Sequence, residues 1–422
     1  MLTFGERLKK ARDRKGMRQT DVMLATGISE PSLSRYESNT THPTPEKITR
    51  LIKLYDVSAE YIMGLTDQMG HAVCTDKDTD AAPDEDVCGK SAEKAIFMGS
   101  EYNISRVFSG TDKRLARELD FVPPVYSKDE ALERDDLKEV SYIFSTWGMF
   151  HFTKDEITSV FPRLKAVFYA AGTVKGFASE FLEAGVDVFS AWGANGIPVA
   201  QFTVAEILLA MKGWFQRVHH GGGSTWTNHN GQGFYPGIMD ETVGIIGAGM
   251  IGREVICELS RYPIKVLVYD KFLPENKIEA LGAEKVSLPE LFERSLVISN
   301  HTANVPETVG MLDYSLFSKM RENAVFINTG RGAQVKHDDL ITALREDSTR
   351  VALLDVTDPD EPPHEGSPLY TMENVFLTPH IAGSTGNEVR RMGEYMYNEY
   401  RAYSSGGDLK YRVTSDMLAT MA

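Results

Sequence analysis

Residues 4–65 carry apolar positions at helical spacing in short stretches. Gly16, Gly27 and the pair Pro43 and Pro45 interrupt these stretches. Apolar residues that recur every three to four positions give a helix one buried face, and glycine or proline between two such stretches separates one helix from the next. The pattern predicts a small bundle of four or five helices, which we assign to a domain of residues 1–67.

Residues 68–93 show no apolar period and are rich in Asp. Such a stretch cannot bury enough apolar surface to fold, and its like charges repel, so we expect an extended, disordered acidic linker. His71, Cys74 and Cys88 lie within it, but their spacing matches no ordinary zinc pattern. We therefore predict no metal site here.

From residue 94 onward, short β-type runs alternate with helical stretches, as is typical of βαβ units around a parallel sheet. Two such series are present, separated by an apolar helix pattern at 203–218 and a glycine-rich stretch at 219–233. The expected strands are 94–99, 140–148, 165–170 and 186–192 in the first series, and 242–249, 265–270, 296–301, 324–330, 351–356 and 375–380 in the second. The predicted fold class is α/β with an all-α N-terminal domain.

The length of 422 residues requires two or three domains, because single cores rarely grow beyond about 250–300 residues. The apolar runs fall short of the roughly 20 residues that cross a bilayer, and no apolar signal segment opens the chain. Three cysteines in this length cannot form a disulfide framework, which fits a reducing compartment. We expect a cytoplasmic protein that does not contact a membrane.

The net charge of −15 excludes indiscriminate nucleic-acid binding by the whole surface, since phosphates repel acidic faces. Residues 1–67 hold 11 Lys and Arg against 9 Asp and Glu, a balance of +2 that leaves −17 for the rest of the chain. Any DNA contact should therefore be local to the N-terminal domain.

Gly247, Gly249 and Gly252 follow an apolar strand pattern and open a helix pattern in TVGIIGAGMIGREVICEL. The first glycine permits a tight turn, the second lets backbone approach a pyrophosphate, and the third lets helix and strand pack closely. The helix N-terminus supplies free N–H donors for the phosphates. Asp270 ends the next strand, 23 positions after Gly247, where a carboxylate binds ribose hydroxyls and repels a 2′-phosphate. The predicted cofactor is NAD.

Three further motifs, NTGRG (328–332), DVTDPDEPP (355–363) and TPHIAGST (378–385), fall at expected strand ends, where open α/β sheets bind ligands. With the glycine motif and Asp270, they make residues 94–403 resemble the D-isomer-specific 2-hydroxyacid dehydrogenases. The resemblance implies a Rossmann NAD-binding domain at 201–380, a flavodoxin-like substrate-binding domain at 94–200 and 381–410, and a homodimer. Its chemistry needs no metal, and the histidine pair 219–220 is better explained as part of a solvated loop.

Hydride transfer from an alcohol carbon needs a proton acceptor and a cation for the substrate carboxylate and carbonyl. His380 is the candidate acid/base, because imidazole titrates near neutrality, and Arg331 matches a carboxylate with its planar fork. The resemblance implies that a glutamate orients the histidine and favours its protonated form. We choose Glu361, which two prolines follow, although Asp360 occupies the register usual in the family and stays an alternative.

The resemblance also implies ligand contacts. Asp355 resembles the acid that meets the nicotinamide carboxamide, and the other expected cofactor contacts are Met250, Ile251, Thr302, Thr329 and His380. AAGTVKGF (170–177) resembles the glycine loop whose backbone N–H groups bind the substrate carboxylate, so the expected substrate contacts are Ala171, Gly172 and Thr173, together with Arg331. The Asp that the family usually has nearby is absent from this loop.

RQTDVMLATGISEPSLSRYE (18–37) resembles the phage-repressor helix-turn-helix, and the likeness covers residues 4–65. Gly27 would allow the turn, Ser29 would cap the second helix, and Pro31 suits its first turn. The residues expected to pack the two helices are Val22, Ala25, Ile28 and Leu33. The candidate DNA contacts are Gln19, toward a phosphate, and Ser29, Glu30, Ser32, Ser34 and Arg35, at or near the start of the recognition helix. A protein-docking role for this bundle is the alternative.

These motifs together predict an NAD-dependent oxidoreductase that interconverts a D-2-hydroxy acid and its 2-oxo acid, with an appended sequence-specific DNA-binding domain. Substrates of the glyoxylate, hydroxypyruvate or phosphoglycerate type are expected. The alternative is a ligand- or NADH-sensing transcriptional regulator whose dehydrogenase fold is not an active enzyme.

Overall fold

The computed structural model describes residues 3–55, 57, 61–62, 93–218 and 235–418. The chain divides into two compact units, Met1–Glu85 and Asp86–Ala422, and each is described by itself. Residues 68–92 of the predicted linker and the histidine pair 219–220 lie outside the described residues.

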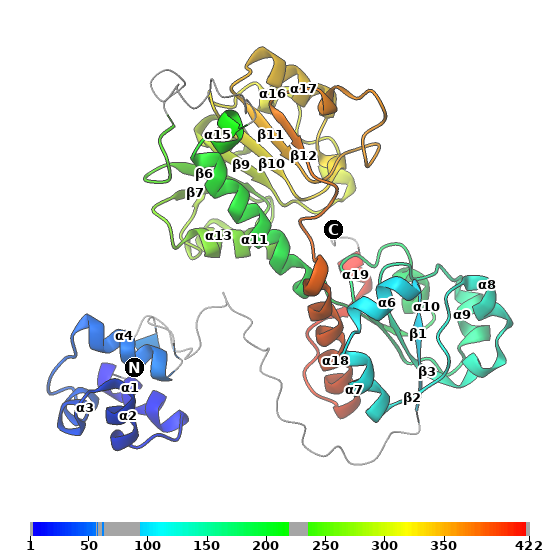
Figure 1. The fold of residues 1–422 in the computed structure, drawn as a ribbon, viewed down its shortest axis with the longest axis horizontal. Helices are drawn as coiled ribbons and strands as arrows, with labels where there is room; N and C mark the ends of the chain where they lie inside the picture. The colour runs from blue at the N-terminus through cyan, green and yellow to red at the C-terminus, as the bar shows by residue number, and fades with distance from the viewer. Residues whose placement is uncertain (1–2, 56, 58–60, 63–92, 219–234, 419–422) are drawn as a thin grey trace. The chain divides into compact units, whose positions relative to one another are not determined.

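The first unit is a small helical bundle, as predicted (Figure 1). Gly27 ends α2 with a positive φ of 73°, which only glycine adopts readily, and so makes the sharp turn into α3. Leu8, Val22 and Leu33 are fully buried in one apolar cluster. The described helices of this unit are α1 (Phe4–Arg14), α2 (Gln19–Thr26), α3 (Glu30–Glu37) and α4 (Pro45–Tyr55).

Two predicted details of the helix-turn-helix are wrong. Ala25 is exposed, because Val22 and Thr26, four positions apart on one face of α2, take the buried places instead. Ser29 does occupy the N-cap of α3, but its hydroxyl lies 2.9 Å from the hydroxyl of Ser32 and makes no capping bond.

The first sheet of the second unit has the order β13-β5-β4-β3-β1-β2. Its five parallel strands run 2-1-3-4-5, which is the flavodoxin-like order, and β13 adds an antiparallel edge. We call this sheet and its helices the first lobe. Its strands are β1 (Lys94–Met98), β2 (Asp120–Phe121), β3 (Val140–Ser145), β4 (Ala166–Tyr169), β5 (Asp187–Ser190) and β13 (Arg412–Val413). Its helices are α6 (Glu101–Val107), α7 (Thr111–Glu118), α8 (Lys128–Glu133), α9 (Lys154–Val160), α10 (Ala178–Glu183) and α19 (Ser415–Leu418).

The second sheet is fully parallel, with the order β12-β11-β10-β9-β6-β7-β8. From β8 to β11 this is the Rossmann order 3-2-1-4-5-6, and ligands bind where it reverses, between β6 and β9. We call this sheet and its helices the second lobe. Its strands are β6 (Thr242–Ile246), β7 (Lys265–Tyr269), β8 (Glu284–Lys285), β9 (Val297–Asn300), β10 (Val325–Asn328), β11 (Val351–Leu354) and β12 (Val375–Leu377). Its helices are α12 (Trp214–Val218), α13 (Met250–Leu259), α14 (Glu275–Glu279), α15 (Leu288–Arg294), α16 (Tyr314–Phe317) and α17 (His337–Glu346).

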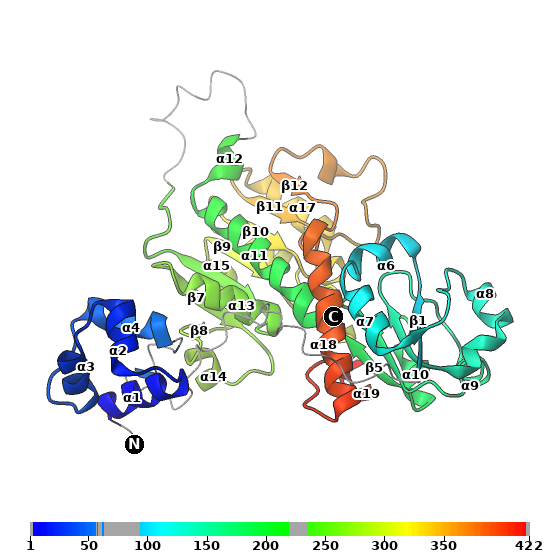
Figure 2. The same cartoon turned by 60° about the horizontal axis from the view of Figure 1, so that its bottom comes forward.

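Two helices join the lobes and pack against each other, α11 (Trp192–Met211) and α18 (Val389–Ser405) (Figure 2). The helix pattern at 203 predicted only the second half of α11, because Gly193, Gly196 and Pro198 disfavour a helix locally. Burial of Pro198 and its neighbours against the protein core outweighs that propensity.

By length and composition alone, α11 could span a membrane, with 20 residues and a mean hydropathy of 1.3. This differs from the expectation that every apolar run is too short. However, 56% of the apolar window is buried inside the protein, as in the core helix of a globular domain. The hydropathy of α11 therefore reflects its packing against α13 and the second sheet.

All the predicted strands of both series are confirmed, and so is the fold class. The predicted boundary at 200/201 falls inside α11, and β13 extends the first lobe past residue 410. Cys257 on α13 is disulfide-bonded, a bond that the cysteine count did not predict. The other two cysteines of the chain, Cys74 and Cys88, lie outside the described residues.

Candidate active site

The turn between β6 and α13 has the geometry of a dinucleotide site. Gly247 has a φ of +88°, and a Cβ there would come within 3.0 Å of the backbone of His301 and Thr302. A Cβ on Gly252 would lie 2.1 Å from the carbonyl oxygen of Gly247, so this glycine permits the close packing of helix and strand. Gly249 has open space around the place of its missing Cβ, which leaves room for a phosphate at the start of α13.

Asp270 follows β7 and is fixed beside this turn. Its Oδ2 accepts a hydrogen bond from the N–H of Ala248 at 2.8 Å, and its Oδ1 accepts from the N–H groups of Phe272 and Leu273. Burial opposes ionisation, but these donors outweigh it and hold the pKa of Asp270 below its usual value. Asp270 therefore presents an anionic acceptor where the adenosine ribose of a dinucleotide would lie.

The other predicted cofactor contacts surround the same strand ends. Met250 and Ile251 open α13, and the Met250 side chain is 44% exposed. Thr302 follows β9, and its hydroxyl donates to Oδ1 of Asn300 at 2.7 Å. Thr329 follows β10 but is buried, with its hydroxyl 3.0 Å from that of Thr203 on α11. The hydroxyl of Thr329 thus already has a partner inside the protein.

Arg331 lies three positions after the end of β10 on a backbone held by buried amides. Asn328 Nδ2 donates to the carbonyl of Arg331, and the N–H of Arg331 donates to Oε1 of Gln334. Asn300 Nδ2 links Asn328 and Gln334 at 3.0 and 2.9 Å. Because every member of this network is satisfied, it fixes the loop that carries the guanidinium.

The guanidinium of Arg331 is partly buried and, within the described structure, donates one hydrogen bond, from Nη1 to the carbonyl of Gly330. Burial lowers the pKa of Arg331, and the nearby carboxylate of Glu361 opposes that shift. Within the residues that the structure describes, most of its donors have no acceptor and can bind an anionic ligand.

His380 and Glu361 are hydrogen-bonded, with Nδ1 of the ring 2.5 Å from Oε1 of the carboxylate. The structure thus pairs Glu361 with the histidine, whereas Asp360 lies toward His364, at 3.9 Å. His380 has a φ of +52°, a conformation that non-glycine residues rarely adopt and that clusters at functional sites. Glu361 thus contacts His380 and lies near Arg331, and the catalytic roles of the three residues stay predictions.

Asp355, at the end of β11, holds the loop that carries His380. Its Oδ1 accepts from the hydroxyl of Thr378 and the N–H of Ile381, and its Oδ2 accepts from the N–H of Ala382. The Asp355 side chain is buried, with only 3% of the residue exposed. Its first role in the described structure is therefore to position the His380 loop.

The candidate substrate loop follows β4. Ser190 shapes it by donating to the carbonyls of Ala171 and Gly172 at 2.9 and 2.5 Å. The N–H of Ala171 donates to the carbonyl of Tyr169, so it already has an acceptor in the described structure, and a contact of Ala171 with the substrate stays a prediction. A tight turn at the strand end uses that N–H internally. Within the described structure, the N–H groups of Gly172 and Thr173 have no protein acceptor.

Asn195 on α11 is a site residue that sequence reasoning missed. Its Oδ1 accepts from the N–H of Ser384 at 3.0 Å, and its Nδ2 lies 3.6 Å from the place of a Cβ on Gly172. Asn195 therefore connects the candidate substrate loop with the end of the His380 loop. Only the fold brings these segments together, so no local pattern could have identified it.

The candidate DNA contacts lie mostly on the surface of the first unit. Ser29, Ser34 and Arg35 are exposed, and Glu30 and Ser32 are partly exposed. Arg35 donates from Nε to the carbonyl of Pro31, which leaves its terminal nitrogens free of described partners.

Gln19, by contrast, donates from Nε2 to Oε2 of Glu37, which also binds Arg12 through two hydrogen bonds. The Nε2 group of Gln19 thus makes a contact within the bundle.

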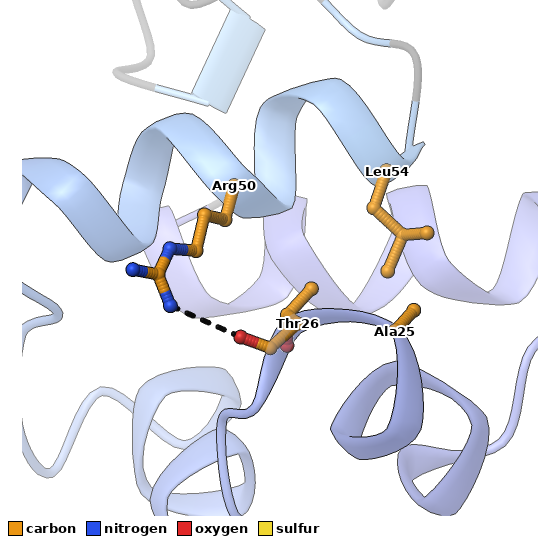
Figure 3. Close-up of a pocket in the computed structure, with 4 residues that line it drawn as sticks. All are labelled: Ala25, Thr26, Arg50 and Leu54. Carbon is orange, nitrogen blue, oxygen red and sulfur yellow. Dashed lines mark hydrogen bonds between the residues drawn. The ribbon is translucent and has the colours of Figure 1, made fainter.

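On another side of the bundle, a surface hollow is lined by Ala25, Thr26, Arg50 and Leu54. Arg50 donates a hydrogen bond to the carbonyl of Thr26 there (Figure 3).

The comparisons with known proteins agree with this geometry. Residues 205–382 match the family model "D-isomer specific 2-hydroxyacid dehydrogenase, NAD binding domain", and residues 8–62 match a helix-turn-helix model. The chain is 31% identical over 290 residues to D-3-phosphoglycerate dehydrogenase of Haemophilus influenzae, covering 66% of this chain and 68% of that protein. It is 32% identical over 201 residues to the enzyme of the same name from Archaeoglobus fulgidus, covering 48% of this chain and only 38% of that longer protein.

The fold also matches solved structures. D-lactate dehydrogenase with NAD+ from Lactobacillus jensenii aligns with a TM-score of 0.61 at 21% identity, over 76% of this chain and 99% of that chain. The sequence matches and the fold matches indicate the same family. The glycine turn and the cluster of Arg331, Glu361 and His380 are consistent with that family. The chain belongs to the D-isomer-specific 2-hydroxyacid dehydrogenase family and carries the NAD-binding domain of that family together with an N-terminal helix-turn-helix domain.

Proposed function

We propose that the chain is an active NAD-dependent dehydrogenase that interconverts a D-2-hydroxy acid and its 2-oxo acid. The observation that carries this proposal is the short contact between His380 and Glu361 beside Arg331. A protein that used this fold only to bind a ligand would not need an acid/base pair. Bound NAD(H) supplies the hydride chemistry, with Gly247, Gly249 and Asp270 as the residues that would hold it.

Each side chain has a defined part in this proposal. Glu361 binds Nδ1 of His380, which leaves Nε2 as the atom that takes the hydroxyl proton during oxidation and returns it during reduction. Arg331 binds the substrate carboxylate and polarises the reacting oxygen through its planar fork. The N–H groups of Gly172 and Thr173, in the first lobe, bind the same carboxylate. Asp355 fixes the position of the His380 loop by accepting hydrogen bonds from its backbone.

The test is a substrate panel. Purified protein is mixed with NADH or NADPH and with glyoxylate, pyruvate or hydroxypyruvate, and nicotinamide absorbance is followed. We expect oxidation of NADH with at least one 2-oxo acid and much slower oxidation of NADPH, because Asp270 repels a 2′-phosphate. No turnover with any 2-oxo acid would instead favour the ligand-sensing regulator.

The helix-turn-helix supports a second activity, sequence-specific DNA binding by α3 with Arg35, Ser34 and Ser29 exposed for contact. A single module of this kind binds weakly, so we propose that a homodimer presents two recognition helices about one DNA turn apart. Ligand binding to the dehydrogenase would then alter their orientation. A gel-shift titration with and without saturating NADH and 2-oxo acid tests this coupling, and unchanged affinity would contradict it.

A further inference from the structure

Within the described structure, no carboxylate pairs with Lys175, an exposed cation of the second unit. It lies in the candidate substrate loop, and its N–H donates to the hydroxyl of Thr173. Its ammonium makes one described hydrogen bond, to the carbonyl oxygen of Asn304 at 2.7 Å. An ammonium has three donors, and a carbonyl is neutral, so most of its binding capacity and all of its charge are unmatched.

The partner of Lys175 places the ammonium at the edge of the candidate site. Asn304 follows β9 in the second lobe, two positions after Thr302, whose backbone nitrogen lies 3.0 Å from the place of a Cβ on Gly247. Lys175 itself follows Gly172, whose N–H is free. The ammonium therefore stands between the loop proposed to hold the substrate carboxylate and the loop beside the dinucleotide turn.

A 2-oxo acid with a single carboxylate does not need the positive charge of Lys175. Arg331 and the free N–H groups of Gly172 and Thr173 already match one carboxylate. Within the described structure, the ammonium of Lys175 stands beside these groups without a carboxylate partner. We propose that Lys175 binds a second anionic group of the substrate, a carboxylate or a phosphate, so that the preferred 2-oxo acid carries two acidic groups. This inference rests on the proposed function.

The test uses substrate pairs that differ only in the second acidic group. Hydroxypyruvate is compared with 3-phosphohydroxypyruvate for the phosphate, and pyruvate with oxaloacetate for the carboxylate. The full chain is assayed as wild type, as Lys175→Met, which removes the charge, and as Lys175→Arg, which keeps it. Lys154→Met, at an exposed lysine of α9, is the matched control.

We expect wild type to prefer one diacidic substrate over its monoacidic counterpart by about tenfold or more in kcat/KM, as a hydrogen bond to a charged group provides. Lys175→Met should lose this preference mainly through KM, because the contact is equal in ground and transition states. Lys175→Arg should retain much of it, and Lys154→Met all of it. The pair that responds, phosphate or carboxylate, identifies the second group.

A binding readout separates this inference from the proposed function. The rise in Tm that each acid produces in the presence of NAD+ is measured for wild type and Lys175→Met. A larger rise with the diacidic member, lost in Lys175→Met, supports the inference even if no substrate is turned over. Equal kcat/KM and equal Tm shifts within both pairs in wild type, or a preference that survives in Lys175→Met, would overturn it.

Discussion

Glu361 reaches His380 across the candidate site with its Oε1 2.5 Å from Nδ1 of the ring, while its neighbour Asp360 points toward His364. The two acids are neighbours in the chain, and from the sequence either could be the partner of the histidine. In the structure only Glu361 fills that role, and it lies near Arg331 as well.

This difference predicts unequal effects of two matched substitutions. Glu361→Gln should lower kcat by about 10²-fold, because the histidine loses the anion that orients and supports it during proton transfer. Asp360→Asn should change kcat by less than about twofold. Steady-state kinetics with the best 2-oxo acid measure both, and an equal loss in the two variants would contradict the assignment.

Asp355→Asn should loosen the His380 loop. An amide in place of the buried carboxylate turns an NH₂ group toward at least one N–H donor, of Ile381 or Ala382, and weakens a hydrogen bond to charge. We expect the free energy of unfolding to fall by roughly 2 kcal/mol and kcat to fall more than KM changes. Urea unfolding and kinetics measure this. Asp408→Asn, at an exposed aspartate, should change neither.

Glu206 on α11 predicts a pH-dependent stability. Burial raises the pKa of Glu206 to about 8, with Asp355 adding to the shift, and its Oε2 is buried without a described partner. The folded state keeps this proton to higher pH than the unfolded state. The free energy of unfolding therefore falls as pH rises from about 4.5 toward 8. The cost is at most about 1.4 kcal/mol for each pH unit.

Glu206→Gln removes this titration. The free energy of unfolding of the variant minus that of wild type should therefore be larger at pH 8 than at pH 5. Urea midpoints at the two pH values give the comparison. A difference between variant and wild type that does not depend on pH would show that Glu206 ionises normally.

Arg35→Ala should weaken DNA binding by the full chain. Its terminal nitrogens are exposed and unpaired in the described structure, and an arginine contact to a base edge is worth about 1–3 kcal/mol, or roughly ten- to hundredfold in Kd. A DNA site selected from a random pool serves as the probe in a gel shift. Lys154→Ala removes one positive charge elsewhere and should leave Kd unchanged, whereas an equal effect of both variants would point to a nonspecific charge effect.

The sequence predicted features that are local in the chain. The glycine turn at 247–252 and Asp270 lie at the ends of two successive strands of one βαβ unit, so their spacing alone indicates a dinucleotide site. The turn at Gly27 was predictable for the same reason. The two series of βαβ units predicted the two largely parallel sheets.

Other features depend on contacts between distant segments. The choice between Glu361 and Asp360 is made by how the loop after β11 meets His380, nineteen positions on. Asn195 joins two loops that are far apart in the chain, and Ala171 uses its N–H within a tight turn. The first half of α11 forms against its local propensity because burial stabilises it. These contacts arise only from tertiary packing.

The central claim is that His380 moves the proton at a site that already holds the cofactor. His380→Ala should lower turnover by about 10²-fold or more, while the Kd for NADH, measured by nicotinamide fluorescence, stays within about twofold of wild type. Turnover that survives in His380→Ala while NADH still binds would contradict the account.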